Sequence, residues 1–99
     1  MLTHVVLVRF ADLATAEEAA QRLLAMEGKI PSMLGIEAGV DITRSARSYE
    51  LALITRHRDA EGLAAYQIHA VHQAVLTFLK AHALGSVAVD FQSEPADSD

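Results

Sequence analysis

Cysteine and tryptophan are both absent from this 99-residue chain, and only two residues are proline. Without cysteine there is neither a disulfide framework nor thiolate chemistry, which fits a reducing compartment, so we expect a cytoplasmic protein. No basic stretch leads into an apolar run at the N-terminus, and nowhere do about 20 apolar residues follow one another. We therefore expect neither a signal peptide nor a membrane span.

Basic residues are also scarce, since eight Lys and Arg stand against thirteen Asp and Glu, for a net charge of −5. Nucleic acids and acidic membrane surfaces are bound by clusters of Lys and Arg, whereas the eight here are scattered along the chain. We expect no nucleic-acid partner and no membrane partner.

Hydrophobic residues, in contrast, are abundant: they make up 52% of the chain with glycine left out. A typical soluble domain has about 45–50% even with glycine counted. A chain of this length suits a single domain with one modest core. The excess indicates apolar surface that one subunit cannot bury alone.

Four segments are predicted to be strands. Residues 3–10 are rich in β-branched residues and too short for a free-standing helix, and residues 36–42 alternate between apolar and polar. Residues 49–57 are apolar through their middle, and 86–91 form the last strand. The polar segment 43–48 connects the second and third strands as a hairpin loop.

Helices are predicted between these strands. Thr15 and Glu18 have the spacing of a capping box, so we expect the first helix to begin at Thr15. Asp59 is placed to cap a short second helix. The chain direction is expected to break at 68–70, and a third helix follows.

The resulting order is β-α-β-β-α-β with a split second helix. It is typical of an α+β, ferredoxin-like subunit whose antiparallel sheet carries helices on one face. We assign residues 1–92 to this domain. Residues 93–99 are polar and acidic, and we expect them to form a disordered tail.

Three of the predicted strands are apolar on both faces, yet helices can cover only one face of the sheet. The simplest cover for the other face is the same sheet of a second copy, related by a two-fold axis. We therefore expect a homodimer with its sheets face to face. The residues expected at its interface are Val5, Leu7, Ala52, Ile54, Val87 and Val89.

The residues best suited to chemistry gather in one stretch, where Tyr66, His69 and His72 lie within seven residues. In a helix they lie one turn apart on one side, and the strand parity of His4 lets it point at the same helices. Imidazole titrates near neutrality and a phenol can donate to a developing oxyanion, so this group suits proton transfer.

Each of these residues also has a structural interpretation. His4 can bond backbone groups at the strand end, Tyr66 can be a core residue, and His69 and His72 can bond carbonyls exposed where two helices meet. A metal site is another interpretation, because His4, His69 and His72 could supply three nitrogen ligands. No acidic ligand or cysteine lies at metal-site spacing, however, so we expect neither a metal nor a cofactor. The remaining histidines are interpreted as surface residues: His57 and His82.

Four stretches of the chain resemble the stress-responsive α/β-barrel (Dabb) family: Leu2–Phe10, Ser45–Leu53, Tyr66–His72 and Val87–Phe91. The resemblance extends over nearly the whole chain apart from the tail. It implies a ferredoxin-like subunit that pairs into a dimeric α/β barrel, in agreement with the two-faced strands.

The resemblance further implies roles for individual residues. In a plant polyketide cyclase of this family, which closes an aromatic ring by aldol condensation, the acid–base pair matches Tyr66 and His72. Its pocket lies between sheet and helices, so a small apolar or aromatic carbonyl ligand is expected here. Ala70 departs from the family's usual proline, and Leu51 from a pocket histidine of the cyclase. The ligand-binding residues expected around the catalytic pair are His4, His69, Val6, Val8, Leu24 and Leu53.

Two other functions stay open. The family includes plant stress proteins and bacterial members of unknown role. The chain could therefore be a non-catalytic structural protein whose histidines stabilise the break between the two helical segments. A monooxygenase of the related dimeric barrel type is a minor alternative, which the absence of tryptophan weakens.

Overall fold

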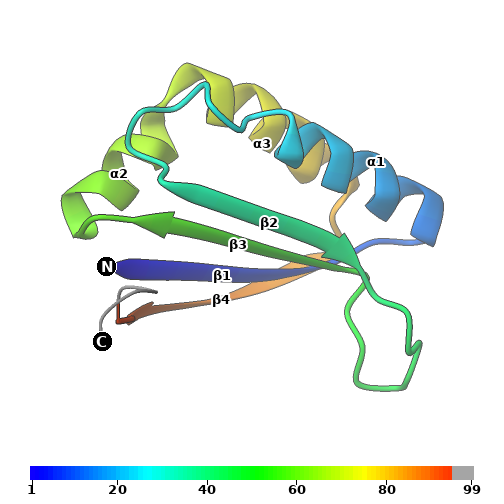
Figure 1. The fold of residues 1–99 in the computed structure, drawn as a ribbon. Coiled ribbons are helices and arrows are strands. Elements are labelled where there is room, and N and C mark those ends of the chain that lie inside the picture. Colours follow the sequence, from blue (N-terminus) through cyan, green and yellow to red (C-terminus); the bar gives the residue numbers. More distant parts are fainter. Residues whose placement is uncertain (95–99) are drawn as a thin grey trace.

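The computed structural model describes residues 1–94 and contains four strands and three helices. The three helices lie together on one side of the sheet (Figure 1). In chain order the elements are β1 (Leu2–Arg9), α1 (Leu13–Leu24), β2 (Gly35–Val40), β3 (Leu51–His57), α2 (Ala60–Ile68), α3 (Ala70–His82) and β4 (Gly85–Gln92).

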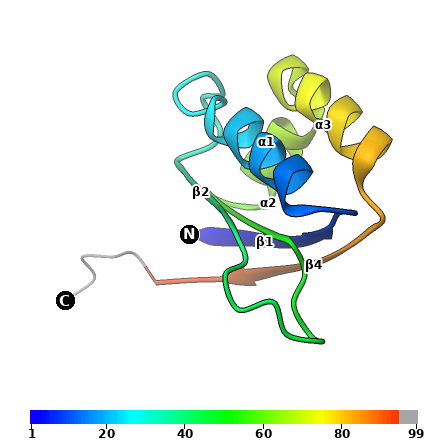
Figure 2. The ribbon, with the colours of Figure 1, turned by 90° about the vertical axis from the view of Figure 1, so that its right-hand side faces the viewer.

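The sheet has the strand order β2-β3-β1-β4, and all three pairings are antiparallel. Figure 2 shows the same two layers from the end, with the helices above the sheet and the β2–β3 loop, residues 41–50, extending beyond the opposite face. The α+β, ferredoxin-like β-α-β-β-α-β prediction is confirmed. None of the helices within residues 1–94 is long and apolar enough to cross a membrane.

Helix α1 begins earlier than the capping-box pattern predicted. Asp12 is the N-cap, with extended backbone angles, and its Oδ1 accepts a hydrogen bond from the Thr15 backbone N–H at 2.8 Å. The prediction of Thr15 as the cap is wrong, because Asp12, three residues upstream, accepts a hydrogen bond from a free N–H of the first turn. The helix then buries Ala16, Ala19 and Leu23, and the two alanines allow it to lie close to the sheet.

The break between α2 and α3 is made by His69, whose backbone leaves the helical region with φ −65° and ψ 140°. Its Nδ1 accepts a hydrogen bond from the Val71 N–H at 3.1 Å, so the side chain caps α3. The Gln67 carbonyl, released by the break, accepts bonds from His72 Nδ1 at 2.9 Å and Gln73 Nε2 at 2.7 Å. These bonds fix the first turn of α3 and with it His72.

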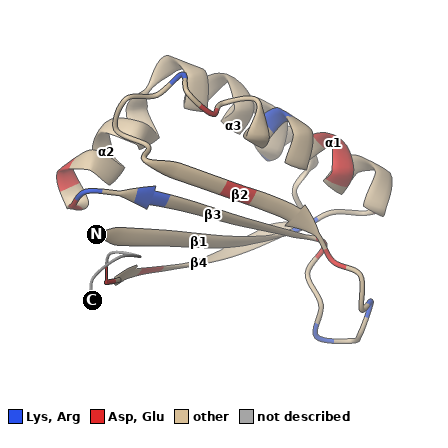
Figure 3. Cartoon of the chain, viewed as in Figure 1, with Lys and Arg blue, Asp and Glu red and all other residues tan. Residues whose placement is uncertain are grey.

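The sheet face opposite the helices, called here the open face, is apolar and partly exposed. Val5 pairs with both Ile54 and Val89, and Leu7 pairs with Ala52 and Val87, so the six residues predicted at an interface share this face. Val89 is 62% exposed. Charged residues are scattered over the molecule and leave most of the sheet without charge (Figure 3).

Ser93, the residue after β4, is hydrogen-bonded to the N-terminal end of the chain. Ser93 donates its backbone N–H to the Met1 carbonyl at 2.8 Å, and its hydroxyl lies 2.7 Å from that of Thr3. Residues of β1 and its N-terminal neighbour thus supply the bonding partners of Ser93. Residues 95–99, which make up most of the predicted disordered tail, lie outside the described residues.

Candidate functional site

A cavity of about 550 Å³ lies between the helix-side face of the sheet and helices α2 and α3. This volume is in the usual range of ligand pockets, about 300–1,000 Å³. His4, Tyr66 and His72 give it one polar end. Apolar side chains form most of the remaining wall: Val6, Val8, Leu53, Leu76, Leu79 and Ala83.

Tyr66 is the central residue of the polar end. Its side chain is fully buried, and its hydroxyl has no hydrogen-bond partner within residues 1–94. Burial raises the pKa of Tyr66 to about 12, so the phenol is neutral near pH 7 and keeps its proton to donate. An unpartnered buried hydroxyl costs about 1–3 kcal/mol.

Three imidazole rings surround the Tyr66 ring. The ring centroids lie 4.4 Å from it for His72, 5.0 Å for His57 and 6.3 Å for His4. His4 comes from β1, His57 from the end of β3 and His72 from α3. Three separate elements thus converge on one phenol. The sequence suggested this for His72 and, from its strand parity, for His4, but not for His57.

The hydrogen bonds of His72 decide which of its nitrogens is basic. Nδ1 lies 2.9 Å from the Gln67 carbonyl, and because a carbonyl only accepts, Nδ1 carries the proton of the neutral ring. Nε2 then holds the free electron pair. Burial lowers the pKa of His72 below its ordinary value, the bond to Gln67 opposes that shift, and His4 lowers the pKa further. His72 is therefore a neutral base near pH 7.

His4 forms a pair with Asp90, whose Oδ1 lies 2.5 Å from His4 Nδ1. The two residues stand opposite each other in the β1–β4 ladder. The carboxylate accepts the Nδ1 proton, so Nε2 is the nitrogen of His4 left for another partner. Carboxylate–imidazole pairing of this kind fixes both the tautomer and the orientation of the ring.

His57 was predicted at the surface, and this prediction is wrong. The residue is fully buried, donates from Nδ1 to the Ser32 carbonyl at 2.8 Å, and accepts at Nε2 from the Thr55 hydroxyl at 2.8 Å. Because both nitrogens are used, His57 supports the Tyr66 ring and has no free electron pair to offer. Burial lowers the pKa of His57. His82 is exposed, as predicted.

The structure places six of the expected pocket residues around the cavity and two outside it. Leu24 is 41% exposed and does not line the cavity, because α1 turns its neighbour Leu23 toward the sheet instead. His69 does not line the cavity either, since its ring caps α3. Within residues 1–94 no group of three or more His, Asp or Glu side chains is placed to hold a metal ion.

Sequence reasoning missed Asp90, Lys80 and Ser86. Asp90 follows an apolar run near the acidic tail and looked like the end of the last strand. Asp90 has the strand parity of Ala88 and the opposite parity to Val89. Once β4 is placed beside β1, this parity indicates that Asp90 lies on the same face of the sheet as His4. Lys80 and Ser86 both line the cavity at the Val8 end, and Ser86 pairs with Val8 in the ladder.

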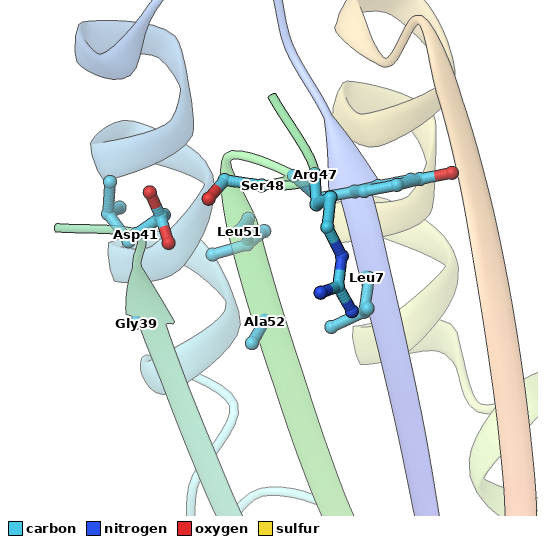
Figure 4. A pocket seen from close by; sticks show the side chains of 9 residues that line it. Leu7, Gly39, Asp41, Arg47, Ser48, Leu51 and Ala52 are labelled. Carbon is cyan, nitrogen blue, oxygen red and sulfur yellow. The ribbon is translucent and has the colours of Figure 1, made fainter. Parts of the chain in front are cut away.

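A second hollow, of about 400 Å³, lies on the open face at the base of the β2–β3 loop. Leu7, Gly39 and Ala52 form its floor, and Arg47 extends from the loop toward Leu7 (Figure 4). The loop is anchored from its other side by Arg44, which donates to Glu50 at 2.6 Å. Tyr49 also lines this hollow, but within the described part of the chain no histidine lies beside it there, in contrast to the Tyr66 cavity.

Comparison with known proteins identifies the family. The sequence profile of the stress responsive A/B barrel domain (Dabb) matches residues 2–93. The chain belongs to the Dabb family. No curated protein matches this Dabb chain.

Solved structures agree with this assignment. A dimeric ferredoxin-like protein of unknown function from Thermobifida fusca is 27% identical, with a TM-score of 0.79, covering 91% of this chain and 88% of that one. A dimeric protein of unknown function from Bacteroides fragilis is 20% identical, with a TM-score of 0.83 and coverages of 93% and 95%.

The fold also occurs in an enzyme. A hydroxynitrile lyase from Passiflora edulis is 10% identical, with a TM-score of 0.76 and coverages of 95% and 96%. At this identity the likeness shows the fold alone. The Dabb chain thus has the α/β-barrel subunit fold of proteins described as dimers.

Proposed function

We propose that the cavity binds a small apolar or aromatic carbonyl compound and transfers a proton to and from it. The observation that carries this proposal is that Tyr66 lines the cavity and that its buried hydroxyl has no hydrogen-bond partner within residues 1–94. A carbonyl oxygen is the acceptor that such a donor lacks. The apolar wall suits the remainder of the ligand.

The chemistry follows from the neighbouring nitrogens. Tyr66 donates to the ligand's carbonyl oxygen while Nε2 of His72 removes a proton from the adjacent carbon. The C–H electron pair moves into the enolate, whose oxygen the phenol stabilises, and return of the proton to carbon restores the ketone. His4, oriented by Asp90, lines the same polar end and holds the ligand against the pair.

Deuterium exchange tests this step directly. In heavy water, proton NMR would follow the α-protons of 4-phenyl-2-butanone with and without the protein. We expect exchange above the buffer rate, and a decrease of about 10²–10⁴-fold in that acceleration for Tyr66→Phe. His82→Gln, in an exposed histidine outside the cavity, is the matched control and should retain the wild-type rate.

His72 also has a structural bond, and a second variant separates the two roles. His72→Asn keeps an N–H donor at the position of Nδ1 for the Gln67 carbonyl but has no basic nitrogen, so it should fold with near wild-type stability and exchange slowly. His72→Ala loses both. If His72→Asn exchanges at the wild-type rate, or the wild-type protein shows no exchange, the catalytic proposal is contradicted.

The alternative is the non-catalytic structural protein. The bonds of His69 and His72 at the helix break favour it, since they stabilise the fold without any ligand. On this alternative His72→Ala lowers the melting temperature, and no carbonyl compound binds the wild-type cavity.

We further propose that a second copy covers the open face. One edge of that face carries a ridge of partly exposed apolar residues on β4: Val87, Val89 and Phe91. The other edge is low, because Gly39 and Ala52 lie in the floor of the loop hollow. A two-fold axis parallel to the strands places the ridge of each copy on the low edge of the other, which supports a closed dimer.

A further inference from the structure

The Tyr66 cavity has a second polar end that the proposed chemistry does not use. Lys80 lines it on α3, eight residues after His72, which is about 12 Å along a helix at 1.5 Å per residue. On the facing wall Val8 follows His4 by four residues, about 13 Å along a strand. Both walls therefore place the Lys80 end at a similar distance from the imidazole end.

The charge at this end has no counterpart in the cavity wall. Lys80 is the one Lys or Arg among the cavity-lining residues, and no Asp or Glu lines the cavity within the described part of the chain. Lys80 takes part in none of the ion pairs that form within residues 1–94. Ser86 adds a hydroxyl at the same end, opposite Val8 in the ladder.

Between the two polar ends the wall is apolar. Val6, Leu53 and Leu76 line the middle of the cavity, and the apolar stem of Lys80 continues this wall before its ammonium reaches water. A ligand that matches this order has a hydrogen-bond acceptor at one end, an apolar or aromatic body, and an anionic group at the other end.

We propose that the cavity selects carbonyl compounds bearing a carboxylate on the side away from the carbonyl, and that Lys80 is the residue that determines this specificity. The inference rests on the proposed function, since it assumes that the carbonyl lies against Tyr66. Lys80 pairs with the carboxylate, and Ser86 donates its hydroxyl to the same group. An uncharged ketone of the same shape binds through the apolar wall and Tyr66 only.

The test compares two probes of nearly equal shape, 6-acetyl-2-naphthoate and its neutral amide, 6-acetyl-2-naphthamide. Their dissociation constants for the full chain would be measured by titration calorimetry at neutral pH and low salt. Because Lys80 is exposed, water weakens its pairing, and we expect the carboxylate to bind about fivefold more tightly than the amide, with a smaller preference at high salt.

Two variants isolate the source of the preference. Lys80→Met keeps the apolar stem and removes the charge, so it should bind both probes equally. Lys29→Met changes the chain's only other lysine, which is exposed in the turn after α1 and does not line the cavity, and should retain the fivefold preference.

The outcomes distinguish this inference from the proposed function. If both probes bind the wild-type protein equally, or if Lys80→Met keeps the preference, the role of Lys80 is refuted while the carbonyl pocket stands. If neither probe binds the wild-type protein, and 4-phenyl-2-butanone shows no exchange either, the pocket proposal fails and the selection by Lys80 fails with it.

Discussion

Replacing Tyr66 by phenylalanine should make the protein more stable. The substitution removes a hydroxyl that is fully buried and has no partner within residues 1–94, and it leaves the ring and its contacts with three imidazoles in place. An unsatisfied buried hydroxyl costs about 1–3 kcal/mol, so the free energy of unfolding should rise by about that amount. For a domain of this size each kcal/mol raises the melting temperature by about 4–8 °C.

Urea and thermal unfolding, followed by circular dichroism, measure this gain. Protomer concentration must be equal for all samples, because the stability of a dimer depends on it. The chain has two tyrosines, and the half-buried Tyr49 is the matched control. Tyr49→Phe should stay within about 0.5 kcal/mol of wild type.

A loss of stability in Tyr66→Phe would refute the reasoning. It would mean that the hydroxyl makes a hydrogen bond that contributes to folding, and the ligand would then have to displace that bond. A gain in stability together with slower deuterium exchange would show that the protein holds an unfavourable group in place for its function.

Two further predictions concern the open face and the histidines. Val89→Asp should raise the dimer dissociation constant at least about 100-fold, because an unpaired carboxylate in an apolar interface costs several kcal/mol. Leu24→Asp, on the helix side, is the control and should leave the dissociation constant unchanged. Analytical ultracentrifugation measures both. Burial lowers the pKa of His57 and of His72 in the folded protein. Below about pH 6.5 the unfolded chain therefore binds protons that the folded chain does not. As the pH falls further, the free energy of unfolding should decrease by up to about 1.4 kcal/mol per pH unit for each histidine. Unfolding free energies that stay constant between about pH 7 and about pH 5 would contradict this.

The fold could be predicted because its pattern is local. The β-branched run of β1, the alternation along β2 and the apolar middle of β3 identified strands, and the two apolar faces of β1, β3 and β4 identified the surface that the helices leave open. The break at His69 was also visible, in a stretch where two histidines follow Ile68. Local patterns failed where two signals competed, since Asp12 and Thr15 are both good caps and only the fold selects one.

The candidate site was predictable only in part, because it depends on register and on long-range packing. Nothing near His57 in sequence shows that the Ser32 carbonyl and the Tyr66 ring enclose it. Asp90 meets His4 only after β4 is aligned with β1, 86 residues apart in the chain. The position of Leu24 differs from that of Leu23 by one helical step, which is enough to turn it from the core to solvent.

Strand β1 supplies both surfaces on which the proposals depend. Its even-numbered residues His4, Val6 and Val8 line the cavity, and its odd-numbered residues Val5 and Leu7 lie on the open face. Substitutions at odd positions can therefore alter assembly while the ligand pocket is inherited unchanged, and the reverse holds for even positions. A one-residue deletion in β1 would exchange the two sets and disable pocket and pairing together, so insertions and deletions should be far rarer in this strand among relatives than substitutions.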